Sequence, residues 1–159
     1  MSFIKTKISK KQFIEITYQI GVDRYHFLHE QFNNQFEFKD PLLFILSTTV
    51  TSLLTKRILK FQNKHFEFDI CDEVDKIVDL AFQENDKTIH ASYFATIKEE
   101  LWDIISNDDP NLVYNLADYF INEITEEKNI EQPLRRYIIN ILCEWHFETK
   151  NFLKTIKLK

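Results

Sequence analysis

The stretch that decides the fold is residues 40–61, which read DPLLFILSTTVTSLLTKRILKF. Asp40 followed by Pro41 is a typical helix start, because aspartate caps the first turn and proline is tolerated at the first helical position. The apolar side chains of this stretch cover more than half of the circumference of a helix. The pattern predicts a helix that runs to about Phe61 and forms the centre of a helical bundle.

The same stretch carries a polar stripe, because Ser47, Thr51 and Thr55 follow one another at intervals of four residues. Its weakly polar run from Leu42 to Leu54 has 13 residues and contains five Ser or Thr. A bilayer-spanning helix needs about 20 mostly apolar residues. We therefore expect a core helix here and no membrane segment.

Apolar residues at helical spacing predict one helix before this stretch and four helices after it. Ser9 can cap the first helix, which carries apolar positions from Phe13 to Phe32 and contains the chain's single glycine, Gly21. Three acidic helices and a last helix follow. Their expected starts, in chain order, are Asp72 or a neighbour, Thr88, Asp109–Pro110 and Pro133.

Two segments are harder to interpret. Residues 65–70 alternate apolar and polar side chains, which predicts a short extended linker that presses Phe66, Phe68 and Ile70 onto the bundle. A two-stranded ribbon with residues 3–8 is the alternative. Residues 148–159 either extend the last helix or fray into a basic tail.

The composition agrees with an all-helical chain. One glycine and three prolines leave few tight turns, which disfavours a fold of many strands. A length of 159 residues fits one domain. The two cysteines, Cys71 and Cys143, are expected to be small buried residues, since neither has a metal-type spacing. We predict a single all-α domain, residues 1–159, built as an irregular bundle of about six helices.

Charge is distributed unevenly along the chain. Residues 1–68 hold ten basic and six acidic side chains, a balance of +4, and residues 132–159 hold six and two, again +4. Residues 69–131 hold four basic and seventeen acidic side chains, a balance of −13. The three middle helices therefore carry a strong negative field within a chain whose net charge is −5.

Many of these acids share helix faces, because they lie three or four residues apart. Solvated outer faces are one interpretation, and a surface for a basic partner is the other. Tyrosines on the same helices are candidate anchors for such a partner. The predicted partner-binding residues are Asp72, Asp75, Asp79, Glu99, Glu100, Asp103, Tyr114, Asp118, Tyr119 and Glu123.

The charge pattern favours one class of function, a binding protein rather than an enzyme. An acidic face repels nucleic acid and attracts basic proteins, of which nucleases are a class that cells must hold inactive. The chain also has basic residues, Arg135 and Arg136 among them, that could contact phosphates. Nucleic-acid binding is nevertheless disfavoured, because the sequence has no helix-turn-helix glycine turn and the chain is acidic overall. We expect a cytoplasmic inhibitor or immunity protein that occludes the active site of a nuclease-type toxin, without cofactor or metal.

Two alternatives stay open. The stripe formed by Ser47, Thr51 and Thr55 would supply polar groups to a pocket between helices, as in a small-molecule-binding or regulatory domain, either monomeric or dimeric. His26 and His29 lie one helical turn apart with Glu30 beside them, so a catalytic or metal site would need further ligands from another helix.

Overall fold

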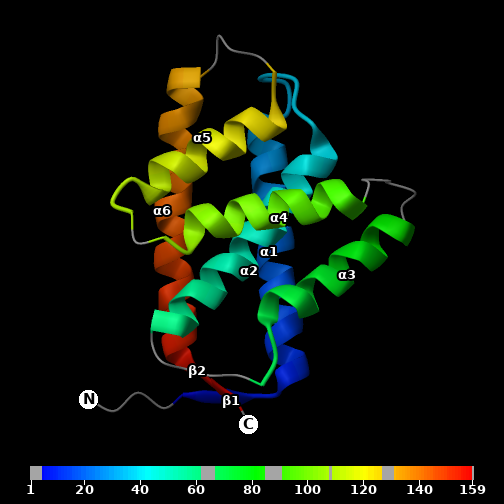
Figure 1. Ribbon diagram of the computed structural model, residues 1–159, viewed down its shortest axis with the longest axis vertical. Coiled ribbons are helices and arrows are strands. Elements are labelled where there is room, and N and C mark those ends of the chain that lie inside the picture. The colour runs from blue at the N-terminus through cyan, green and yellow to red at the C-terminus, as the bar shows by residue number, and fades with distance from the viewer. Residues whose placement is uncertain (1–4, 62–66, 85–90, 108, 127–130, 159) are drawn as a thin grey trace.

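Helix α2, Asp40–Phe61, lies at the centre of the structure, and the other helices pack around it (Figure 1). The computed structural model describes residues 5–61, 67–84, 91–107, 109–126 and 131–158. Its other helices are α1 (Lys10–Phe32), α3 (Ile70–Glu84), α4 (Ala91–Ile105), α5 (Leu112–Ile124) and α6 (Glu131–Thr155). The described residues thus form the predicted all-α bundle with a single core.

Figure 1 shows how the layers lie. Helices α1 and α6 run along the long axis of the molecule, and α4 crosses in front of them. Helix α2 packs against α1, α3, α4, α5 and α6. Because it is enclosed on so many sides, α2 buries fifteen of its residues, and Leu43, Ile45, Leu46 and Val50 have no exposed surface.

Helix α2 is long and apolar enough to cross a membrane by length and composition. In this structure the other helices bury 83% of its most apolar 18-residue window. Its buried hydroxyls are mostly satisfied within the helix: Thr51 donates to the carbonyl of Ser47 at 2.8 Å, and Thr55 donates to that of Thr51 at 2.8 Å. These bonds allow a Thr-rich helix to serve as the core element.

The starts of the helices follow the predicted signals only in part. The Ser9 side chain caps α1 in a capping box, accepting from the Gln12 N–H at 3.1 Å while the Gln12 side chain accepts from the Ser9 N–H at 2.8 Å. Helix α3 begins at Ile70 rather than Asp72, because Asp69 accepts from the Cys71 N–H at 2.8 Å. The predicted cap Thr88 lies outside the described residues.

The last two helices also differ from their predicted starts. The Asp109–Pro110 pair forms a turn, with Asp109 accepting from the Asn111 N–H at 2.8 Å, and α5 begins only at Leu112. Helix α6 begins at Glu131, so Pro133 lies in its first turn instead of opening it.

The two ends of the chain pair with each other. Strand β1, Thr6–Ile8, runs parallel to strand β2, Ile156–Leu158, in a two-stranded sheet. The prediction of a frayed tail at 148–159 is therefore wrong: α6 continues to Thr155 and leads directly into β2. Parallel strands demand a long crossover, and here almost the whole bundle provides it.

The linker prediction for residues 65–70 is partly corrected. Phe68 packs against the core as expected, but Ile70 is the first residue of α3 and not part of an extended segment, and Phe66 lies outside the described residues. The alternative ribbon between this segment and residues 3–8 is wrong, since β1 pairs with β2. Cys71 is buried, whereas Cys143 is exposed, contrary to its prediction.

Gly21 sets the distance between α1 and α2. A Cβ atom at this position would lie 2.9 Å from the Cα atom of Thr48 and 3.3 Å from its Cγ2 atom. The first contact is with backbone, so the two helices would have to move apart.

We expect Gly21→Ala to lower the free energy of unfolding by about 1–3 kcal/mol, the usual cost of overpacking a core. The same change in an open helix would raise stability by about 1 kcal/mol. Urea unfolding followed by circular dichroism measures the difference. Gln19→Ala, at an exposed position of the same helix, is the control and should change stability by less than about 0.5 kcal/mol. An unchanged or more stable Gly21→Ala protein would show that this crossing is not tight.

Candidate functional site

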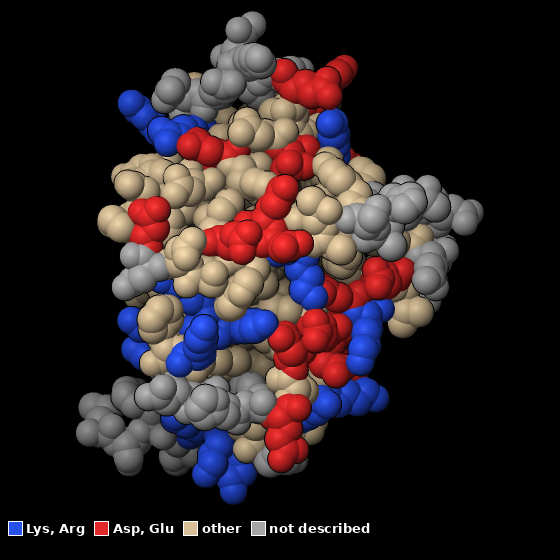
Figure 2. All heavy atoms as spheres, viewed as in Figure 1, with Lys and Arg blue, Asp and Glu red and all other residues tan. Residues whose placement is uncertain are grey.

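Many acidic side chains of α3, α4 and α5 can be seen on one face of the molecule, with Lys and Arg side chains beside them. Acidic side chains gather across the middle of the view in Figure 2, over α4 and α5, and beside them over α3. We call this the acidic face and define it by the carboxylates predicted from the sequence: Asp72, Asp75, Asp79, Glu99, Glu100, Asp103, Asp118 and Glu123. These residues lie on α3, α4 and α5 and have different partners.

Between α3 and α4, Lys98 forms ion pairs with two of the acids. Its Nζ atom lies 3.0 Å from a carboxylate oxygen of Asp72 and 2.5 Å from one of Asp75. Burial is the largest influence on Asp75 and raises its pKa, with help from the nearby charges of Asp72 and Asp79, while Lys98 acts to lower it. Partial burial also acts to lower the pKa of Lys98, but the bonds to the two aspartates outweigh it and the pKa is raised.

Between α4 and α5, two tyrosines donate hydrogen bonds to glutamates. The Tyr119 hydroxyl donates to Glu100 at 2.6 Å, and the Tyr93 hydroxyl donates to Glu123 at 2.7 Å. The bond to Glu123 is the main reason that the pKa of Tyr93 is raised to about 12. Burial and the bond to Glu100 raise the pKa of Tyr119. Both tyrosines therefore stay protonated donors that fix the position of a carboxylate.

Between α5 and α6, Arg135 pairs with Asp118. Its Nε atom donates at 2.7 Å and its Nη2 atom at 3.3 Å, one to each carboxylate oxygen, which is the bidentate geometry that arginine favours. The guanidinium also lies over the ring of Tyr114, 5.7 Å from its centroid. Tyr114 keeps 48% of its surface exposed.

Three predicted carboxylates have no such role. The side chains of Asp79 on α3 and of Glu99 and Asp103 on α4 are exposed, and within the described part of the chain they make no ion pair. The predicted set thus divides in two: some residues tie neighbouring helices together, and Asp79, Glu99 and Asp103 present charge to solvent.

The two histidines considered for a catalytic or metal site both contact the ring of Tyr25 but differ in their other partners. His29 lies 3.3 Å from Asp40, which also accepts from the Tyr25 hydroxyl at 2.6 Å, whereas His26 is exposed and contacts the ring of Tyr25. Among the described residues, no group of three or more His, Cys, Asp or Glu side chains is placed to hold a metal ion.

Arg24 was not among the residues predicted from the sequence. Its side chain is 7% exposed and reaches from α1 to Thr51 on α2 and to Glu148 and Thr149 on α6. The signal was present, because Arg24 follows Thr17 and Gly21 and precedes Leu28 at helical spacing on the buried face of α1. A charged residue on such a face needs an explanation.

A cavity of about 190 Å³ adjoins this arginine and two residues of the predicted polar stripe, Thr51 and Thr55. The third residue of the stripe, Ser47, is fully buried, and its hydroxyl has no hydrogen-bond partner among the described residues. The pocket sought beside the stripe is therefore found at its Thr51–Thr55 end.

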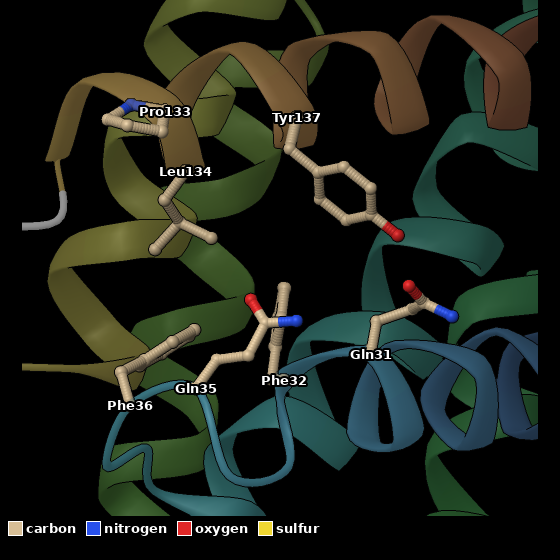
Figure 3. A pocket seen from close by; sticks show the side chains of 7 residues that line it. All are labelled: Gln31, Phe32, Gln35, Phe36, Pro133, Leu134 and Tyr137. Atoms are coloured by element: carbon tan, nitrogen blue, oxygen red, sulfur yellow. The ribbon is translucent and has the colours of Figure 1, made fainter.

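A larger cavity, about 420 Å³, lies between the end of α1, the segment that follows it, and the start of α6. Figure 3 shows Tyr137 and Leu134 of α6 on one side, and Gln31, Phe32 and Gln35 on the other. Its walls are mostly aromatic and aliphatic, with two amides and one hydroxyl, so it suits an uncharged group. None of the residues predicted to bind a partner lines it.

Comparison of the chain with protein-family models, with curated proteins and with solved structures finds no match in any of the three.

Lys98→Met should destabilise the protein by about 1–3 kcal/mol at neutral pH, because it leaves the half-buried Asp75 unpaired. The pKa of Asp75 is already raised, so stability is lost as the pH rises from the usual Asp range through that raised pKa. Without Lys98 the pKa of Asp75 should rise further, and the decrease in the free energy of unfolding between acidic and neutral pH should become larger. The difference from the unmodified protein should accordingly be largest near pH 7 and shrink near about pH 4, as measured by urea unfolding at both pH values.

Lys76→Met is the matched control for this prediction. Lys76 is an exposed lysine of α3 that lies 3.5 Å from Glu73, and such surface pairs contribute less than about 1 kcal/mol. Equal destabilisation by the two substitutions, or a Lys98→Met effect that does not depend on pH, would contradict the role given to Lys98.

Proposed function

We propose that this chain is a protein-binding domain that docks its acidic face onto a basic protein and inhibits it. The observation that carries the proposal is the set of exposed carboxylates at Asp79, Glu99 and Asp103, which have no ion pair within the described part of the chain. Like charges on neighbouring helix positions cost a few tenths of a kcal/mol each. A partner that neutralises them would remove this cost.

The carboxylates that are already paired also support docking at the acidic face. Lys98, Tyr93, Tyr119 and Arg135 hold acids in fixed positions, so the surface around the unpaired carboxylates is rigid before a partner arrives. Preorganised charge loses little conformational entropy on binding. The exposed ring of Tyr114, at the edge of this surface, is the kind of aromatic side chain that dominates binding energy in protein interfaces.

The charge also selects the class of partner. Exposed charges act mainly by steering a partner of opposite sign and by rejecting partners of the same sign. Phosphates are repelled, and a protein with a basic active-site cleft is attracted. A nuclease-type toxin fits this description, because its cleft must be basic to hold nucleic acid. The domain would occlude that cleft in the cytoplasm, as an immunity protein does, without a catalytic step of its own.

The test is capture of partners from an extract of the native cells, at low and at raised salt, with Asp79→Asn/Glu99→Gln/Asp103→Asn beside the unmodified protein. We expect the unmodified protein to retain a basic protein at low salt and to lose it as salt rises, because the Debye length shrinks. The triple variant should bind the same purified protein at least about tenfold more weakly, mainly through a slower association rate. Nuclease activity of the captured protein should fall when the unmodified domain is added.

Glu15→Gln/Asp23→Asn/Glu30→Gln on α1 is the matched control, since it removes the same number of exposed acids from another surface. It should leave the affinity nearly unchanged. Binding that survives the acidic-face variant, or that falls equally in the control, would overturn the proposed docking face, and a captured protein whose activity is unaffected would overturn the inhibitory role.

A further inference from the structure

Arg24 is a buried cation held at the junction of α1, α2 and α6. Its Nη1 atom donates to the hydroxyl of Thr51 at 3.0 Å, and its Nη2 atom lies 3.3 Å from the carbonyl oxygen of Trp145 and 3.4 Å from the hydroxyl of Thr149. The guanidinium carbon lies 5.0 Å from the centroid of the Trp145 ring. Only 7% of the residue is exposed.

The positive charge of Arg24 is paired with a carboxylate through a single contact. Burial is the largest influence on Arg24 and lowers its pKa, and the nearby charge of Glu148 opposes that effect. Glu148 pairs with Arg24 through one carboxylate oxygen, which lies 3.3 Å from Nη2. The Glu148 side chain is 61% exposed. The Nε–H of Arg24 is buried and has no hydrogen-bond partner among the described residues. A bidentate carboxylate would use such a donor, whereas Glu148 leaves it unused.

The cavity beside Arg24 has room for a small ligand. It measures about 190 Å³, the volume of about six water molecules in the liquid. Its wall includes Thr17, Ile20, Thr55 and Phe152 in addition to Arg24 and Glu148. Glu148 is the exposed member of this wall, so it can move into solvent without disturbing the core.

The threonine hydroxyls define what else the ligand must carry. Thr17 donates its proton to the carbonyl of Phe13 at 2.8 Å, and Thr55 donates its proton to the carbonyl of Thr51 at 2.8 Å. With their protons used, both hydroxyls offer only lone pairs to the cavity. A ligand group that faces them must therefore be a hydrogen-bond donor.

From this geometry we propose that the cavity binds a short carboxylate with a donor group, hydroxyl or ammonium, on the adjacent carbon. The ligand's carboxylate takes the place of Glu148 on Arg24, including its Nε–H, and the donor group bonds to Thr55. Ile20 and Phe152 contact the short apolar remainder. This site is distinct from the acidic face, so neither proposal depends on the other.

Isothermal titration calorimetry with L-lactate, L-alanine and propionate tests the proposal on the full chain. Glu148→Gln removes the competing carboxylate and should tighten lactate binding about tenfold, since a charge-assisted contact is freed for the ligand. Propionate lacks the donor and should bind several-fold more weakly than lactate. Thr55→Val should abolish that difference. Glu148→Gln should raise the affinity for lactate more than the affinity for alanine, because the ammonium group of alanine also loses a negatively charged neighbour. The two affinity changes therefore distinguish a hydroxy acid from an amino acid as the preferred ligand.

Glu126→Gln is the control, because Glu126 is an exposed acid paired with Lys39 at 3.4 Å outside this cavity. It should leave all three affinities unchanged. The proposal is overturned if neither lactate nor alanine binds saturably to the unmodified protein or to Glu148→Gln up to about 10 mM, a range that covers very weak sites. Binding that is indifferent to both Glu148→Gln and Thr55→Val would place the ligand elsewhere and also overturn it.

Discussion

The enclosure of α2 is the constraint on which the rest of the structure depends. A helix with fifteen buried residues must be covered on nearly every side. The helices α1, α3, α4, α5 and α6 therefore all pack against it. Its buried hydroxyls can be tolerated because most of them bond to the carbonyl one turn earlier in the same helix. Gly21 lets α1 approach its backbone closely, so contact with α2 is made by main chain as well as by side chains.

That arrangement determines where charge can go. Since the inward faces of α3, α4 and α5 are committed to α2 and to one another, their acids are confined to the outer surface. Neighbouring helices are then joined by polar contacts above the core: Lys98 spans α3 and α4, Tyr119 spans α5 and α4, and Arg135 spans α6 and α5. The acidic face therefore partly serves to join neighbouring helices, and the carboxylates without such contacts are the ones that we propose to meet a partner.

Local signals made most of the helices predictable. The Ser9 cap gives α1 its position because capping acts over three or four residues. The Asp40–Pro41 pair located the start of α2, which has Asp40 as its first residue. Helix α3 begins two residues before Asp72, because Asp69 accepts the free N–H groups of Cys71 and Asp72. The strands were missed because β1 and β2 have three residues each and pair across the whole chain, which leaves no local pattern.

Periodicity placed the acids on common faces, but it did not show which of them are neutralised. Whether Asp75 or Asp79 meets Lys98 depends on the angle at which α4 crosses α3, and a sequence pattern does not contain that angle. For Arg24, too, the sequence pattern does not identify the partners. Its place on the buried face of α1 is visible in the sequence, but its partners lie 27 and about 120 residues away and only the fold brings them together.

The acidic face and the Arg24 cavity use charge under opposite physical conditions. Exposed carboxylates act over a distance through water, so their effect fades once the Debye length falls below about 10 Å. Arg24 is shielded from solvent and acts only at contact, where added salt screens little. Ionic strength would therefore separate the two proposed activities: binding of a basic protein to the acidic face should be sensitive to it, and binding of a carboxylate to Arg24 should be much less so. The burial of one charge and the exposure of the others follow from the same enclosure of α2.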